Sequence, residues 1–164
     1  LRRQRQMCIR DRFMTTGWEI RAASHRDLDQ LVEIETAQFP EPWSRRLLKD
    51  ELELVTHRRY TVAVAGTQVL GVLGLMLIDA DAHINTIATH PDYESRGVAR
   101  SLLDEAIPVV SAGGYTRITL EVAVGNTRAR NLYTAYGFAP LGVRKQYYRV
   151  TGEDALVLVR YLNN

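Results

Sequence analysis

The spacing of hydrophobic residues along the chain predicts four helices. Apolar side chains recur every three or four positions in four segments, as expected for helices that bury one face. Ser24, with Asp27 three residues later, forms a capping-box pattern in front of the first, and Ser44 can cap the second. Pro40 separates these two helices. The helices are expected around residues 28–37, 47–52, 97–111 and 127–136.

Runs of β-branched and other apolar residues predict seven strands. The run at 60–65 is joined by Gly66 and Thr67 to a longer run at 69–78, which is typical of a hairpin. The second arm is apolar throughout, so we expect it near the centre of a sheet. The expected strands are residues 18–21, 60–65, 69–78, 83–89, 116–122, 143–148 and 155–161.

The order of these elements is β-α-α-β-β-β-α-β-α-β-β. An antiparallel meander followed by one βαβ crossover gives an α/β fold with a mixed sheet. No repeat, low-complexity tract or Pro/Gly/Ser-rich linker divides residues 14–164, so we expect them to form one domain.

Charge is distributed unevenly along the 164 residues. The whole chain has 21 basic and 19 acidic side chains, but residues 1–13 carry a net charge of +4, so residues 14–164 carry −2. The single cysteine, Cys8, lies in the basic segment, which excludes a disulfide framework, a thiolate metal site or a cysteine nucleophile in the rest. The near-neutral remainder gives no electrostatic reason for strong nucleic-acid binding.

No apolar run reaches the roughly 18–20 residues that cross a bilayer, so we expect a cytoplasmic protein with no membrane partner.

The basic segment itself has three interpretations. Met14 opens a stretch that reads as a natural start, so we interpret residues 1–13 as a non-native or disordered basic leader. A basic arm that contacts RNA phosphates and an amphipathic targeting peptide are the alternatives.

A strand–loop–helix segment at residues 87–100 has the chemistry of a phosphate site. Free backbone N–H groups and the helix dipole favour an anion at the start of a helix. Gly97 and Ala99 allow close backbone approach, and Arg96 and Arg100 add positive charge. The alternative is an ordinary helix start with two solvated arginines.

Glu121 and Tyr133 are candidates for proton transfer. Glu121 lies between Leu120 and Val122 in an apolar strand; in a cleft, partial desolvation would raise its pKa and make it a general base. Tyr133 follows on the next helix, and a phenol is a suitable general acid toward a thiolate. A solvent-facing glutamate and a core-packing tyrosine are the alternatives. The four histidines show no metal-ligand spacing, so no metal is expected.

The stretch HPDYESRGVA at 90–99 resembles the acetyl-CoA motif of the GNAT (GCN5-related) N-acetyltransferases, and NLYTAYGF at 131–138 resembles the region that follows it. The resemblance runs from Ile20 to Leu162 and is strongest to the ribosomal-protein-alanine (RimI-like) N-acetyltransferases. It implies a mostly antiparallel seven-stranded sheet flanked by about four helices, with a splayed central strand pair that holds acetyl-CoA.

The resemblance also implies site residues. Glu121 would take a proton from the substrate's α-ammonium, and Tyr133 would protonate the departing CoA thiolate. A backbone N–H of the fourth strand would stabilise the oxyanion. The positions implied to bind acetyl-CoA are Ile87, Ala88, Thr89, Ser95, Arg96, Gly97, Val98, Ala99, Arg100 and Asn126.

The implied reaction is acetylation of a protein N-terminus, that of a small-subunit ribosomal protein beginning with Ala. Two alternatives remain: a small-molecule amine as acceptor, or an acetyl-CoA-binding module without turnover. Glu94 departs from the motif, which usually opens with Gln or Arg, so this position offers no positive charge to the cofactor. A polyamine site would need several carboxylates in the cleft, and the candidates are Glu41, Asp50, Glu51 and Glu53.

Overall fold

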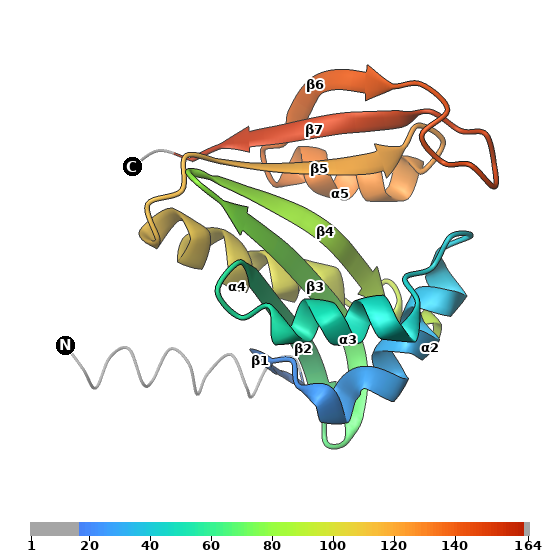
Figure 1. The fold of residues 1–164 in the computed structure, drawn as a ribbon, viewed down its shortest axis with the longest axis vertical. Helices are drawn as coiled ribbons and strands as arrows, with labels where there is room; N and C mark the ends of the chain where they lie inside the picture. The colour runs from blue at the N-terminus through green and yellow to red at the C-terminus, as the bar shows by residue number, and fades with distance from the viewer. Residues whose placement is uncertain (1–16, 163–164) are drawn as a thin grey trace.

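The computed structural model describes residues 17–162, which form one seven-stranded sheet with helices on both faces (Figure 1). The strand order is β1-β2-β3-β4-β5-β7-β6, and every neighbouring pair is antiparallel except β4 and β5. The leader predicted at residues 1–13 lies outside the described residues. The strands are β1 (Glu19–Ala22), β2 (Arg58–Ala65), β3 (Gln68–Ile78), β4 (Asp81–Thr89), β5 (Arg117–Ala123), β6 (Ala139–Arg144) and β7 (Ala155–Tyr161).

Four α-helices connect these strands. The helices are α2 (Leu28–Gln38), α3 (Arg45–Glu53), α4 (Val98–Ala112) and α5 (Thr127–Ala135), with short 3-10 turns η1 (His25–Asp27) and η2 (Pro91–Tyr93). Ser44 caps α3 as predicted, since the Leu47 N–H donates to Ser44 Oγ at 3.2 Å. The capping box of Ser24, whose N–H donates to Asp27 Oδ2 at 2.9 Å, starts a 3-10 turn that leads into α2. The predicted α/β architecture is therefore confirmed.

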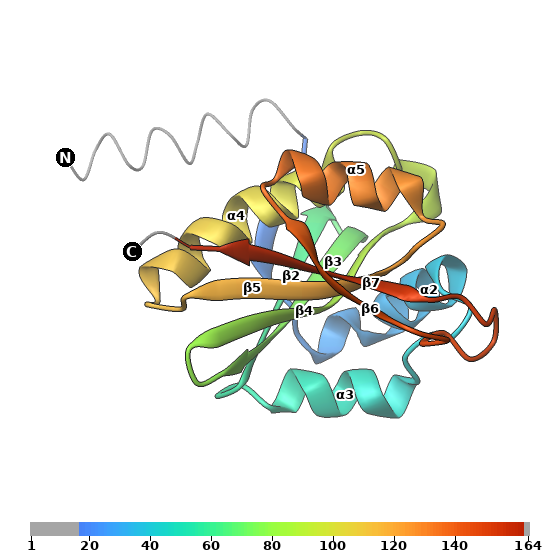
Figure 2. The ribbon, with the colours of Figure 1, turned by 90° about the horizontal axis from the view of Figure 1, so that it is seen from above.

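Each face of the sheet has its own core. Helices α2 and α3 cover one face, and α4 and α5 lie on the other (Figure 2). Leu31 and Ile34 of α2 pack with Val62 and Val72, whereas Leu102 of α4 belongs to the cluster on the opposite face. Alternate residues of a strand point to opposite faces, so each strand contributes side chains to both layers.

Strands β4 and β5 separate after a short ladder. They pair in parallel over only three positions, ending at His83 and Thr119, although both strands continue beyond that point. Figure 1 shows the two strands diverging. This separation is the predicted splay, and it opens a gap in the middle of an otherwise continuous sheet.

The predicted position of the sixth strand is wrong. We expected residues 143–148, but β6 starts at Ala139 and ends at Arg144. The ladder stops there because Gln146 adopts the left-handed conformation, with φ of 48°, and its N–H donates to Asp154 Oδ1. Pro140 is tolerated within β6 because β6 is an edge strand. Tyr147 and Tyr148 therefore lie in a turn and do not alternate between strand faces.

Among the described residues, 17–162, no helix is both long and apolar enough to cross a membrane.

Candidate active site

A pocket of about 460 Å³ lies where the end of β4, the start of α4 and the start of α5 meet. All the sequence-predicted cofactor residues except Arg96 line this pocket, and Tyr133 lines it too. The Arg96 guanidinium instead lies over the Tyr93 ring, 5.3 Å from its centroid. The pocket also has lining residues that the sequence did not predict to bind the cofactor, namely Gln38, Phe39, Glu94, Arg128, Ala129, Asn131 and Leu132.

The loop before α4 has the backbone shape of an anion site. Ser95 and Gly97 both adopt left-handed backbone conformations, with φ of 61° and 90°, and Gly97 is the N-cap of α4. The first N–H groups of an α-helix have no partner within the helix, so they are available to a phosphate. Any side chain at Gly97 would be strained by this φ.

Glu94, which departs from the family motif, is engaged through both carboxylate oxygens. Gln38 Nε2 donates to Glu94 Oε1 at 2.6 Å, and Arg128 Nη1 lies 3.3 Å from Glu94 Oε2. Arg128 Nη2 also donates to Ser95 Oγ at 2.8 Å. Gln38 ends α2 and Arg128 belongs to the first turn of α5, so only the tertiary fold brings them to this loop.

Tyr133 and Asn126 approach the pocket from α5. Asn126 is the N-cap of α5: its Oδ1 accepts from the Ala129 N–H, which leaves the amide NH₂ group as a donor. The Tyr133 ring packs edge-on against Phe138, with 5.9 Å between centroids. Burial and then the nearby Tyr148 raise the pKa of Tyr133, so its phenol keeps its proton at neutral pH. Within the described residues its hydroxyl has no hydrogen-bond partner.

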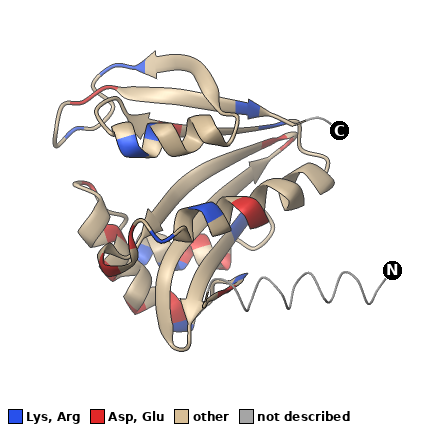
Figure 3. Ribbon diagram, turned by 180° about the vertical axis from the view of Figure 1, so that it is seen from behind, with Lys and Arg blue, Asp and Glu red and all other residues tan. Residues whose placement is uncertain are grey.

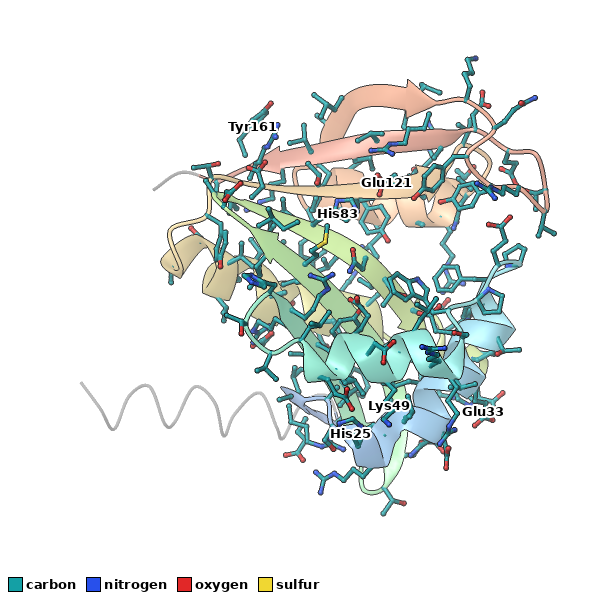
Figure 4. The ribbon with its side chains drawn as sticks, in the orientation of Figure 1. His25, Glu33, Lys49, His83, Glu121 and Tyr161 are labelled. Atoms are coloured by element: carbon teal, nitrogen blue, oxygen red, sulfur yellow. The ribbon has the colours of Figure 1, made fainter. Side chains whose placement is uncertain are left out.

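Glu121 lies on β5 immediately beyond the point where β4 and β5 part. Its neighbours Leu120 and Val122 belong to the core under α4, so Glu121 points to the opposite face of the sheet. Glu121 Oε2 lies 2.8 Å from His83 Nε2, and only 11% of the glutamate side chain is exposed (Figure 4). His83 Nδ1 in turn lies 2.8 Å from Thr119 Oγ1. Since an ionised carboxylate only accepts hydrogen bonds, Nε2 carries the hydrogen of the His83–Glu121 contact.

The expected direction of the Glu121 pKa shift is wrong. Burial does raise the pKa of this carboxyl, but the hydrogen bond and charge of His83, together with the charge of Arg144, outweigh it. Arg144 Nε lies 3.5 Å from Glu121 Oε1. The net result is a pKa below the ordinary value of 4.5. Glu121 is therefore held in its ionised form, which it keeps into mildly acidic solution.

Two loops border the Glu121 side of the opening. The segment after β6 brings Tyr147 and Tyr148 near the Glu121 carboxylate, whose charge contributes to a raised pKa in both phenols. Burial is the largest cause, and the pKa of Tyr148 reaches about 12. The α2–α3 loop meets this segment where the Val150 N–H donates to Glu41 Oε1.

His83 is the functional candidate that sequence reasoning missed. A lone histidine in an alternating strand is typical of packing or solvation, and nothing near it in the chain identifies a partner. Its relation to Glu121 depends on the register of β4 against β5, which places His83 opposite Thr119. Within residues 17–162 no group of three or more metal-ligating side chains lies close enough to hold an ion.

Comparison with known proteins identifies the family of this chain. Residues 28–138 match the Acetyltransferase (GNAT) family. The ribosomal protein bS18-alanine N-acetyltransferase of Haemophilus ducreyi is 32% identical over 146 residues, which cover 84% of this chain and 95% of that protein. N-alpha-acetyltransferase RimI of Mycobacterium tuberculosis is 31% identical over 147 residues, 86% of this chain and 90% of that protein.

The crystal structure of the ribosomal-protein-S18-alanine N-acetyltransferase from Escherichia coli has the same fold. Its TM-score is 0.83 at 24% identity, and the match covers 90% of this chain and 95% of that one. The resemblance to ribosomal-protein-alanine N-acetyltransferases is thus confirmed across nearly the whole described chain. The chain therefore belongs to the GNAT family of acetyl-CoA-dependent N-acetyltransferases.

Proposed function

We propose that this protein transfers the acetyl group of acetyl-CoA to the α-amino group of a protein N-terminus, namely the N-terminal alanine of ribosomal protein bS18. The proposal rests on the opening between β4 and β5. Tyr133 approaches this opening from the α4 face of the sheet, and Glu121 approaches it from the opposite face. A thioester lying in this opening is accessible to an amine from one side and to a proton donor from the other. Direct transfer between two bound substrates then needs no covalent enzyme intermediate.

The pocket described above is the proposed binding site of acetyl-CoA. The pyrophosphate would bind the backbone from Ser95 to Arg100, and the pantetheine arm would lie along Ile87 to Thr89 beside Asn126; apart from Arg96, these residues line one pocket. This position directs the acetyl group toward the splay. A backbone N–H of β4 would then stabilise the negative charge that develops on the carbonyl oxygen.

Glu121 is the proposed base. Its low pKa makes it a poor acceptor for a free ammonium, whose usual pKa is about 8, so the N-terminus first loses one proton to bulk water and attacks as the neutral amine. However, the attacking nitrogen becomes positively charged as the C–N bond forms, and its proton becomes far more acidic. An ionised carboxylate can accept that proton directly or through water, and before the attack it attracts the cationic N-terminus.

Tyr133 is the proposed acid. As the C–S bond breaks, the phenol donates to the sulfur and supplies the proton that converts the thiolate to CoA-SH. Its buried, protonated state supports this role, because an ionised group there would repel the leaving group.

The acceptor is inferred from the relatives and from the charges on the acceptor side. The two relatives above are similar over more than four fifths of the chain, and one is a bS18-alanine N-acetyltransferase. Of the four carboxylates that a polyamine site could use, Glu51 accepts from Arg58 and Tyr60, and Glu53 lies beside Lys49. Glu41 accepts from the Val150 N–H at the loops that border the Glu121 side, which is one carboxylate where a polyamine site would need several. None of the four candidate acids lines the pocket.

An acceptor panel tests this proposal. The full chain is incubated with acetyl-CoA and either a peptide with the bS18 N-terminal sequence, the same peptide with its α-nitrogen blocked, or spermidine. We expect mass spectrometry to locate the acetyl group on the α-nitrogen of the free peptide alone. Turnover of spermidine without peptide turnover would support the small-molecule alternative, and acetyl-CoA binding without any turnover would support the binding-module alternative.

A further inference from the structure

Arg128 and Glu94 join the two walls of the pocket, and we propose that Arg128 is a ligand for the pyrophosphate of acetyl-CoA, held in place by Glu94. The inference rests on the proposed function, since it takes acetyl-CoA as the occupant of the pocket. It concerns the position at which this chain departs from the GNAT motif, where an acid replaces the usual Gln or Arg.

An unpaired carboxylate at Glu94 would oppose cofactor binding. The carboxylate lines the same pocket as the phosphate-binding loop, and like charges in a partly desolvated site repel each other. In the structure, however, Gln38 Nε2 donates to one oxygen and Arg128 faces the other. The negative charge of Glu94 is thus balanced by the guanidinium of Arg128 from α5. This guanidinium provides the positive charge that Glu94, the first residue of the loop motif, lacks.

The contacts of Arg128 fix its guanidinium beside the loop. Nη1 faces Glu94 Oε2 at 3.3 Å, and Nη2 donates to Ser95 Oγ at 2.8 Å. A guanidinium has five N–H donors, so these two contacts leave others for an anion. The side chain is 63% exposed, which leaves it accessible to a ligand. A planar guanidinium also matches the geometry of phosphate oxygens well.

The other arginines near the loop contact aromatic rings or a backbone carbonyl. Arg96 stacks over Tyr93 and is not a lining residue, and the Arg100 guanidinium lies 5.9 Å from the centroid of the Tyr136 ring. Helix α5 carries Arg128 and Arg130, and its basic segments are visible in Figure 3. Arg130 donates to the Val124 carbonyl and does not line the pocket, so it provides a matched control.

Calorimetry on the full chain tests the assignment. We expect Arg128→Gln to weaken acetyl-CoA binding roughly 10- to 100-fold, the range for losing a hydrogen bond between charged groups, while Arg130→Gln binds like wild type. The loss should be equal for acetyl-dephospho-CoA, which keeps the pyrophosphate. It should be absent for acetyl-pantetheine, which has no phosphate and whose binding is followed by NMR titration.

The role of Glu94 is tested in the same assay. Glu94→Ala should weaken acetyl-CoA binding several-fold although it removes a negative charge, and this effect should disappear in the Arg128→Gln background. Tighter binding by Glu94→Ala would show that the pair opposes the cofactor and would overturn the positioning role.

Two further outcomes would overturn the assignment of Arg128. One is unchanged acetyl-CoA affinity of Arg128→Gln; the other is a loss that vanishes with acetyl-dephospho-CoA, which would assign Arg128 to the 3′-phosphate. If wild type itself does not bind acetyl-CoA, the proposed function fails instead, so the two failures are distinguishable.

Discussion

His83 Nε2 lies 2.8 Å from Glu121 Oε2, and this contact joins β4 to β5 where their ladder ends. Thr119 Oγ1 completes the arrangement on the other ring nitrogen of His83. The carboxylate is therefore fixed in orientation and stabilised in its ionised form at the edge of the opening.

Replacing Glu121 by Gln tests the proposed base. The amide has nearly the same size but cannot accept a proton, so we expect the turnover rate to fall by roughly 10²- to 10⁴-fold. Acetyl-CoA affinity should stay the same, because Glu121 does not line the pocket. Glu19→Gln, on the exposed edge strand β1, serves as the control. Near-normal turnover by Glu121→Gln would remove this residue from the mechanism.

Replacing His83 by Leu tests how the Glu121 charge is maintained. The pKa of the Glu121 carboxyl in wild type, followed by NMR of its side-chain carboxyl carbon, should lie below the ordinary glutamate value of 4.5. Without the hydrogen bond from His83, less opposes the effect of burial, and the pKa of Glu121 should rise. Circular dichroism at each pH controls for unfolding. An unchanged Glu121 pKa in His83→Leu would indicate a packing role for His83 only.

Replacing Tyr133 by Phe removes one hydroxyl and keeps the ring against Phe138. We therefore expect a folded protein with nearly unchanged KM for acetyl-CoA and a kcat lower by roughly 10²- to 10⁴-fold. Tyr136→Phe is the matched control: Tyr136 directly follows α5 and lies outside the pocket, where its hydroxyl donates to Asp104. If both variants retain wild-type kcat, another group must protonate the thiolate.

Replacing Glu35 by Gln tests a buried carboxyl beneath α2. Glu35 is fully buried, accepts from Thr86 Oγ1, and has a second oxygen without a partner within the described residues. Burial raises its pKa in the folded protein, so ionising it costs stability as pH rises above the unfolded value. Relative to Glu35→Gln, wild type should be most stable in acid and lose stability toward neutral pH. Urea unfolding of both proteins across this range measures the difference; a difference that does not change with pH would contradict the prediction.

The local structure and the family of this protein follow from its sequence alone. Caps such as Ser44 and periodic apolar positions act over a few residues, so the positions of the helices are predictable from neighbours in the chain. The strand–loop–helix segment around Gly97 is equally local, and it carries the resemblance to the acetyl-CoA motif.

The tertiary structure decided which distant side chains meet and how that changes their chemistry. His83 reaches Glu121 through the β4–β5 register, and Arg128 reaches Glu94 because α5 folds back beside α4. The sequence correctly predicts Glu121 in an apolar strand but predicts the wrong direction for its pKa shift. The burial of Glu121 can be expected from its neighbours in the chain, whereas the charges that oppose the effect of burial come from other strands. Strand β6 was misplaced for a similar reason: its register is set by pairing with β7, which no local pattern encodes.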